Sequence, residues 1–575
     1  MTAPDRLRLR AGRVALESRL GLRPPPSVLV GGRPVVGQDL LAGRLRAGGR
    51  EVTLEPGVPG PWGIVADDPA AMDALHRFGW LDDLGALGGA EARALARRWT
   101  EVWEARFGTR RRELAWRPDI AGLRLLALMR NAPLLLDARP VAEAEALVAL
   151  MIAHLGDLAG RAERAEPGLP RLSALAALVI GSLCLPGQAG HTIRAQAALG
   201  RHCAEVIEVD GGLPDRRPDA LAEALVLLVA VRAALIEAGQ APDPAHEGAV
   251  GRMAGAVRTL RHAGGEMARF HGGGSGDAGA IDLALAALDL RPRPPAGMAA
   301  GFARLAAGRT VVIADVTTPP PGGTASMLAF ELSSGRRPVI VSRGAFGGAG
   351  PHWGHAGRAP EAHAALCLDG VAPAPGAIVE GRAEPAEAAA GGLALVYSHD
   401  GYAGSHGLTH VRRLELSRDG RALSGSDMLL CVDGAQRQRF GARVAAAQDG
   451  EGLRVTVRFP LHPDAVPQLD PAARCIHIAL PSGEVWRLSC HEGAAPGLEP
   501  AVFLDDADAG RVRPSWHVVL ICDVTAPGHR IGWTLAKSDA TPVAVRDPGP
   551  EGPADPAPAR PDVPPDDTPI DLTGA

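Results

Sequence analysis

The chain has 575 residues, of which 46% are hydrophobic and 22% charged, and its formal net charge at pH 7 is -5. This length allows two to four folded units, and the composition is that of a globular protein rather than a disordered or membrane-embedded one. So small a net charge provides no basic footprint for nucleic acid. We therefore expect no nucleic-acid partner, and an acidic ligand would need a local basic patch.

The N-terminal sequence MTAPDRLRLRAGRVALESRLGLRPPP is charged throughout and lacks the apolar segment of a secretory signal. No later stretch reaches the roughly 18 uncharged apolar residues that a membrane span requires. Residues 1–60 are therefore interpreted as the N-terminal arm of a cytoplasmic chain. The seven cysteines are widely spaced and never form C-x-x-C, which indicates neither a disulfide framework nor a zinc ribbon.

Residues 61–290 are predicted to be helical, because their apolar residues recur at helical spacing. The clearest apolar stripes are Leu95, Trp99, Trp103 and Phe107; Leu147, Leu150, Leu155 and Leu158; and Leu221, Leu225, Leu228 and Leu235. Such stripes are typical of a helix face packed in a core. Breaks at Pro167, Pro186, Pro214 and Pro242 predict helices of ordinary length joined by short loops, the pattern of stacked helical hairpins.

The period changes after a Pro-rich linker at residues 291–300. Leu453, Val455, Val457 and Phe459 alternate with polar residues, which predicts a half-buried antiparallel strand. Asp419-Gly420 and Ser482-Gly483 each lie between extended runs and predict hairpins. Residues 301–540 are thus predicted to form stacked antiparallel sheets, and residues 541–575, rich in Pro and Asp, a disordered tail.

Strong local catalytic motifs are absent from the sequence. It contains no G-x-S-x-G elbow, no Walker loop and no H-E-x-x-H. The glycine run HGGGSGD at residues 271–277 is interpreted as a turn between helices. Polar residues gather instead in VDGGLPDRRPD and RHAGGEMARFHGGG of the helical half, and in GRAPEAHAALCLDG and SHDGYAGSHGLTHVRR of the β half.

The order of several segments resembles that of the heparinase II/III-like polysaccharide lyases, in particular the form common in alphaproteobacteria. The segments are LHRFGWLDDLGALGGAEARALARRWTEVW, FELSSGRRPVIVSRG, GRAPEAH, SHDGY, THVRRLELSRDGRALSGSD, FPLHP, LPSGEVWRL and LEPAVFL. They span residues 60–535. The resemblance implies an N-terminal (α/α) toroid followed by a C-terminal antiparallel β-sandwich, with a substrate groove between them.

The same resemblance implies β-elimination at a uronic acid unit of an acidic polysaccharide such as heparin, heparan or alginate. The reaction needs a group that neutralises the uronate carboxylate, a base for the C5 proton and an acid for the leaving oxygen. Relatives carry the loop D-G-G-H-x-S-R-N-P, whereas residues 210–218 here read DGGLPDRRP, without the His and the Asn. Asn131 is the only asparagine and Tyr397 and Tyr402 are the only tyrosines.

The lyase hypothesis therefore assigns its roles to the residues that remain. His363, in the R-x-x-x-x-H segment that begins at Arg358, is the expected base, and Tyr402 the only phenolic acid in the matching segments. Arg217 occupies the position of the missing Asn, and Arg217 or Arg216 would bind the uronate carboxylate. Arg358 would bind substrate, and His399 and Asp400 would shape the edge of the groove.

No cofactor is required by this hypothesis, but a structural zinc in the β half is an open alternative. His410 matches a position that, in some members of the family, binds zinc together with an aspartate. Asp369 is the candidate second ligand, and a third was not identified.

Two other functions stay open. A catalytically degenerate relative, acting as a saccharide-binding or envelope-associated protein, would explain the lost His, Asn and helical Tyr. The second alternative is a glycoside hydrolase that uses Asp210 and Asp215 as paired carboxylates. The family implies the cell envelope or periplasm, in conflict with the missing signal. Oligomeric state is left open.

Overall fold

The structure is a computed structural model, and it describes residues 20–541 except for short gaps. The gaps are residues 30, 48–49, 56, 110–112, 290–296, 321–325, 345–355, 358, 375, 386–392, 448–451, 492–493, 506–510 and 540. The start of the predicted arm, most of the predicted linker and the predicted tail therefore lie outside the described residues, as does Arg358.

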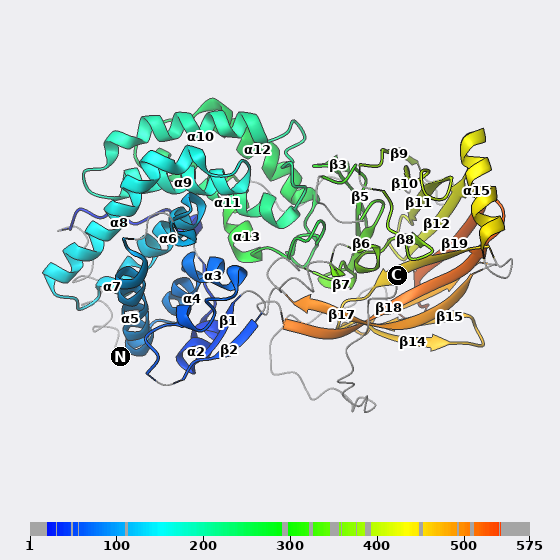
Figure 1. The fold of residues 1–575 in the computed structure, drawn as a ribbon, viewed down its shortest axis with the longest axis horizontal. Helices are drawn as coiled ribbons and strands as arrows, with labels where there is room; N and C mark the ends of the chain where they lie inside the picture. The colour runs from blue at the N-terminus through cyan, green and yellow to red at the C-terminus, as the bar shows by residue number, and fades with distance from the viewer. Residues whose placement is uncertain are drawn as a thin grey trace.

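The N-terminal half is a set of packed helices (Figure 1). They are α2 (Pro34–Leu41), α3 (Pro69–His76), α4 (Gly79–Leu87), α5 (Gly89–Phe107), α6 (Pro118–Arg130), α7 (Ala132–Leu136), α8 (Val141–Arg161), α9 (Leu169–Cys184), α10 (Thr192–Val206), α11 (Pro218–Glu237), α12 (Pro244–Thr259) and α13 (Ala278–Ala286). The four predicted proline breaks all fall between helices. A short hairpin of β1 (Arg44–Ala47) and β2 (Arg50–Thr53), which the sequence analysis did not predict, lies beside α2 and α3.

The predicted apolar stripes form the core of this half. All four stripe residues of α5 are buried, and so are those of α8 and α11. On α5 the indole rings of Trp99 and Trp103 contact Trp62, Trp80 and Trp116 at ring-centroid distances of 5.2–6.2 Å. Aromatic side chains bury large apolar areas, so this cluster fixes α5 against its neighbours.

The C-terminal half consists of antiparallel sheets, as the sequence predicts. One sheet has the order β3-β4-β5-β6-β7, a second β17-β18-β13-β8, and a third β14-β15-β16-β19-β12-β11-β10-β9. The strands are β3 (Gly297–Ala299), β4 (Phe302–Ala307), β5 (Thr310–Asp315), β6 (Phe330–Ser334), β7 (Arg337–Ile340), β8 (Leu366–Leu368), β9 (Val379–Pro385), β10 (Leu393–Tyr402), β11 (Leu408–Leu416), β12 (Ala422–Leu430), β13 (Leu453–Pro460), β14 (Val466–Asp470), β15 (Cys475–Ala479), β16 (Val485–Cys490), β17 (Ala495–Asp505), β18 (Arg511–Val524) and β19 (His529–Lys537).

Local sequence explains these strands. In β13, Leu453, Val455, Val457 and Phe459 are buried while the residues between them are more exposed, which confirms the predicted alternation. Gly420 and Gly483 have positive φ values of 69° and 81° at the two predicted hairpins. One helix, α15 (Gly434–Ala446), follows β12 and was not predicted.

The two halves meet at a packed seam. Phe302, Val311, Ile313 and Ala329 of the first sheet belong to the same buried hydrophobic cluster as the helices. The rings of Phe270 and Phe302 lie 5.2 Å apart across this seam. A second apolar cluster joins the three sheets to one another.

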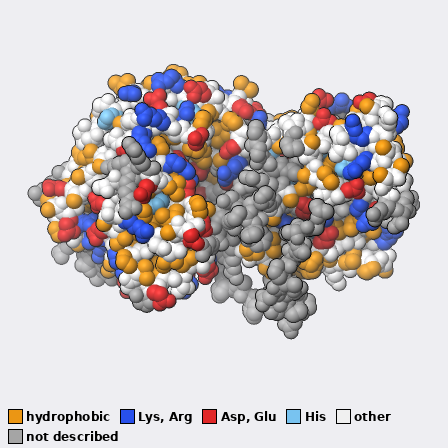
Figure 2. Space-filling model, viewed as in Figure 1, with side chains coloured by type: hydrophobic (Ala, Val, Ile, Leu, Met, Phe, Trp, Pro, Cys, Tyr) orange, Lys and Arg blue, Asp and Glu red, His pale blue; other side chains and the backbone are white. Residues whose placement is uncertain are grey.

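Acidic, basic and hydrophobic side chains are interspersed on the face shown in Figure 2. Within the part of the chain that the structure describes, no helix combines the length and the apolar character needed to cross a bilayer.

Candidate functional site

The loop between α10 and α11 brings Arg216 and Arg217 to the seam. Gly211 has a φ of 84°, and a Cβ there would overlap the carbonyl of Arg252, so the tight turn requires glycine. Arg216 itself adopts a left-handed φ of 53°. Its guanidinium lies 2.9 Å from Glu208 and 3.9 Å from Asp210, and it lies beside Gly301 of the β half.

Arg217 is engaged by a carboxylate of its own helix. Its Nε and Nη2 donate to Asp219 at 3.2 and 2.7 Å, a bidentate ion pair. The second oxygen of Asp219 also accepts from the backbone N–H of Gly274. Asp215 and Glu223, which are both exposed, lie in the electrostatic neighbourhood of Arg217. Carboxylates therefore surround the arginine that the lyase hypothesis assigns to a substrate carboxylate.

His363 lies in a buried polar cluster on the β side of the seam. It is 2% exposed, and its Nδ1 lies 3.0 Å from the hydroxyl of Ser342. Burial, followed by the nearby His271, lowers the pKa of His363 to about 4. His271 lies 3.3 Å from the buried Asp315. His363 is therefore neutral at pH 7 and shielded from solvent.

A second group of hydrogen bonds crosses the same seam at Glu331, which is fully buried on β6. Its carboxylate accepts from the backbone N–H groups of Arg269 and Ser342 at 2.9 and 3.0 Å, and lies 3.2 Å from His262 Nε2. Burial alone would raise the pKa of Glu331, but its hydrogen bonds and the charges of His262 and Arg269 hold that pKa below its ordinary value. The helical half thus contributes His262 and Arg269 to a site on the β half.

His399, Asp400 and Tyr402 lie at the C-terminal end of β10. The Tyr402 side chain is fully buried, its hydroxyl donates to the carbonyl of Leu366 at 3.0 Å, and burial raises its pKa well above the ordinary value. The carboxylate of Asp400 accepts from the backbone N–H of Ile378, and His399 Nδ1 accepts from that of Gly401. These contacts hold the end of β10 in place. Among the contacts of the described residues, none joins His399, Asp400 or Tyr402 to Arg216 or Arg217.

His410 forms a buried chain of hydrogen bonds with His399 and Asp427. His410 Nδ1 lies 3.1 Å from His399 Nε2, and His410 Nε2 lies 2.8 Å from Asp427 Oδ1. Arg412 Nε donates to the same Asp427 oxygen at 2.7 Å, and Trp533 Nε1 donates to the other at 3.2 Å. Asp369 is not part of this group, because its carboxylate lies 3.4 Å from His406 instead.

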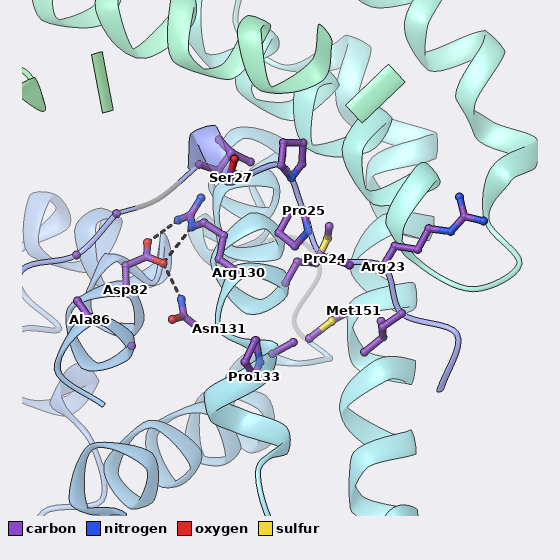
Figure 3. A pocket seen from close by; sticks show the side chains of 18 of the residues that line it. Arg23, Pro24, Pro25, Ser27, Asp82, Ala86, Arg130, Asn131, Pro133 and Met151 are labelled. Atoms are coloured by element: carbon purple, nitrogen blue, oxygen red, sulfur yellow. Dashed lines mark hydrogen bonds and ion pairs between the residues drawn. The ribbon is translucent and has the colours of Figure 1, made fainter. Parts of the chain in front are cut away.

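A separate cavity of about 510 Å³ lies in the helical half (Figure 3). Its walls come from residues 22–34 and from α4, α6, α7 and α8. Arg130 and Asn131 both point toward Asp82, which accepts hydrogen bonds from them at 2.5–3.1 Å. The only asparagine of the protein is therefore committed to this cavity and not to the α10–α11 loop.

Comparison with known proteins identifies the family. A family model described as heparinase II/III-like, C-terminal, matches residues 289–534. The chain is 30% identical over 542 residues to FtsZ-localized protein C of Caulobacter vibrioides (strain NA1000 / CB15N), with 88% of each chain covered. The chain belongs to the heparinase II/III-like family.

Solved structures agree with this membership. The crystal structure of heparinase III has a TM-score of 0.69 at 12% identity and covers 92% of this chain and 89% of its own. That of a heparan sulfate lyase HepC mutant from Pedobacter heparinus has a TM-score of 0.58 at 13% identity, covering 94% and 89%. At such low identity these structures establish the shared fold alone.

The zinc implied by the family resemblance does not fit the residues around His410. Each ring nitrogen of His399 and His410 already has a hydrogen-bond partner, and a metal ion needs their lone pairs. The Arg412 guanidinium occupies the Asp427 oxygen that a cation would use. Asp369, the proposed second ligand, lies with His406.

Sequence reasoning missed the residues that complete these clusters. Glu331, Asp315 and His271 make their contacts only where the two halves pack, so no local pattern predicts those contacts. Asp427 and Arg412 are different, because they pair directly across the β11–β12 hairpin. The predicted turn at Asp419-Gly420 is the signal that would have revealed that pair.

Proposed function

We propose that this protein is a heparinase-fold member that acts by binding a partner rather than by cleaving a polysaccharide, and that it associates with FtsZ assemblies. The observation that carries the proposal is the burial of the phenols. A β-eliminating lyase needs an acid in contact with the leaving oxygen, and Tyr402 is fully buried with its hydroxyl donated to Leu366. Tyr397 is 5% exposed and its hydroxyl donates to Met298.

The charge around Arg217 supports the same proposal. An anionic uronate would have to displace Asp219 from its bidentate pair and approach Asp215 and Glu223. The bidentate pair with Asp219 therefore competes with a uronate carboxylate for Arg217. The missing Asn and His of the α10–α11 loop leave no neutral side-chain hydrogen-bond donor there to replace them.

The partner is proposed from the relative whose printed name is FtsZ-localized protein C. The similarity covers 88% of each chain, which includes both the helical half and the sheets. A partner of FtsZ must share its compartment, so we propose a cytoplasmic location instead of the envelope location that the lyase resemblance implies.

Two measurements on the full chain test this proposal. FtsZ from the same organism, assembled with GTP, is sedimented with and without the protein, and we expect the protein in the pellet only when FtsZ polymers form. A panel of uronate polymers is incubated with the protein, and we expect no rise in the ultraviolet absorbance of an unsaturated product. Absence from the FtsZ pellet refutes the association, and product absorbance refutes the non-catalytic assignment.

The second candidate is the lyase itself, acting on a heparin-, heparan- or alginate-like polymer. It is favoured by the position of His363, which lies at the seam beside His271 and Asp315. In that reading Arg216 or Arg217 holds the carboxylate and His363 is the base. Absorbance that appears with the wild type and disappears in His363→Ala would establish it, whereas reducing sugar released without absorbance would indicate a hydrolase.

A further inference from the structure

The hairpin of β14 and β15 gathers three metal-binding side chains far from the seam. Asp470 and Cys475 pair directly across the hairpin, and His477 is two residues further along β15, on the same face as Cys475. We propose that Asp470, Cys475 and His477 bind one divalent cation of the zinc class.

The geometry agrees with shared coordination. The Cys475 Sγ and His477 Nε2 atoms lie 3.6 Å apart. A tetrahedral zinc bound by a thiolate and an imidazole separates sulfur from nitrogen by about 3.5 Å, as follows from Zn–S and Zn–N distances of about 2.3 and 2.0 Å. The ligand atoms of all three residues lie within 4.8 Å of one another. An ion therefore fits between them with small side-chain adjustments.

The chemistry of the donors selects the ion. One thiolate, one imidazole and one carboxylate form a mixed set that suits zinc and similar borderline-soft cations rather than calcium or magnesium. Cys475 is fully buried while Asp470 and His477 are half-buried, so the ion would reach the thiol from the solvent side. The backbone N–H of Ala473 donates to Asp470 Oδ1, which orients the carboxylate for binding.

The position of the site suggests what the ion does. β14 is the edge strand of the eight-stranded sheet, and none of its residues is buried. Few apolar contacts stabilise such a strand, so a cation that links Asp470 to β15 would stabilise the pairing of β14 with β15. Three protein ligands leave a fourth position for water.

The alternative is a thiol–imidazole hydrogen bond without a metal. The chain offers a control for it, because Cys522 Sγ on β18 and His529 Nε2 on β19 lie 3.7 Å apart. No carboxylate completes a third ligand there among the described residues. A cation that requires all three ligands will therefore bind at Cys475 and His477 but not at Cys522 and His529.

Cobalt(II) titration of the untagged full chain tests the proposal, since a thiolate bound to cobalt gives a charge-transfer band in the near ultraviolet. We expect one equivalent of cobalt to produce the band, and zinc to abolish it by displacement. The band should be lost in Cys475→Ser, remain in Cys522→Ser, and require at least about tenfold more cobalt in Asp470→Asn.

Circular dichroism of each variant reports whether it is folded. Asp470→Asn is nearly isosteric, so it keeps the test informative if Cys475→Ser fails to fold. Absence of the band in the wild type overturns the proposal, and so does a band that persists in Cys475→Ser or disappears in Cys522→Ser.

Discussion

At the scale of single residues, the buried chain of hydrogen bonds at Asp427 is the most highly constrained feature. Burial alone would raise the pKa of this carboxyl, but the charge of Arg412 and hydrogen bonds from His410 and Arg412 hold it well below its ordinary value. Because His399 Nδ1 accepts from Gly401, His399 Nε2 carries a proton and donates to His410, which in turn donates to Asp427. Every partner is fixed without a metal.

We expect Arg412→Ala to destabilise the protein by about 3–5 kcal/mol. The substitution leaves the Asp427 carboxylate buried without its cation, and such an uncompensated charge is strongly unfavourable. Urea unfolding followed by circular dichroism measures the free energy of unfolding. Arg413→Ala is the matched control, because Arg413 is partly exposed and pairs with Glu415, and it should change stability by less than about 1 kcal/mol. Equal effects of the two variants would contradict this account.

At the scale of elements, the sequence predicted most of the secondary structure and two hairpins, but not the order of the strands in the sheets. The alternation in β13 and the stripe on α5 follow from burial of one face, which local sequence records. A turn centred on Asp419-Gly420 also sets the register that brings Arg412 opposite Asp427. That pairing was therefore predictable, whereas α15 was not, since its residues are mostly polar or exposed and only Gln436 and Phe440 are buried.

The contact between β12 and β19 depends on glycine at position 425. Gly425 pairs with Trp533, and a Cβ at Gly425 would overlap the indole ring. We expect Gly425→Ala to destabilise the protein by about 1–3 kcal/mol through overpacking and to alter the near-ultraviolet circular dichroism of Trp533. Gly441→Ala on α15 has open space at its Cβ and should be neutral or stabilising. An unchanged tryptophan signal in Gly425→Ala would show that the ring is not held there.

At the scale of the whole molecule, the seam could not be predicted from the sequence. His262 and Glu331 are 69 residues apart, and Arg269 and Glu331 are 62 apart. The segments that contribute them were recognised as polar loops and family motifs, but their contacts arise only when the two halves pack. The two halves and their order were therefore predictable from the sequence, whereas the contacts of the buried acids and histidines between them required the structure.

The buried histidines of both halves make the free energy of unfolding depend on pH. Burial is the main cause that lowers the pKa of both His363 and His76 to about 4, below the roughly 6.5 of an unfolded chain. Between these values the unfolded state binds more protons than the folded state, so the free energy of unfolding falls as pH decreases from 6.5 to 4. Each such histidine contributes a slope of about 1.4 kcal/mol per pH unit in that window.

We expect His363→Gln to remove its share of this slope, and His363→Gln combined with His76→Gln to remove about twice as much, because the two sites are distant and independent. Urea titrations at pH 7.0, 6.0, 5.0 and 4.5 give the free energies of unfolding, with the last three values inside the window. The slope is the readout because the loss of the Ser342 hydrogen bond changes stability equally at every pH. Slopes identical to wild type would show that these histidines titrate in the folded protein as they do in the unfolded chain, which would contradict the effect of burial on their pKa.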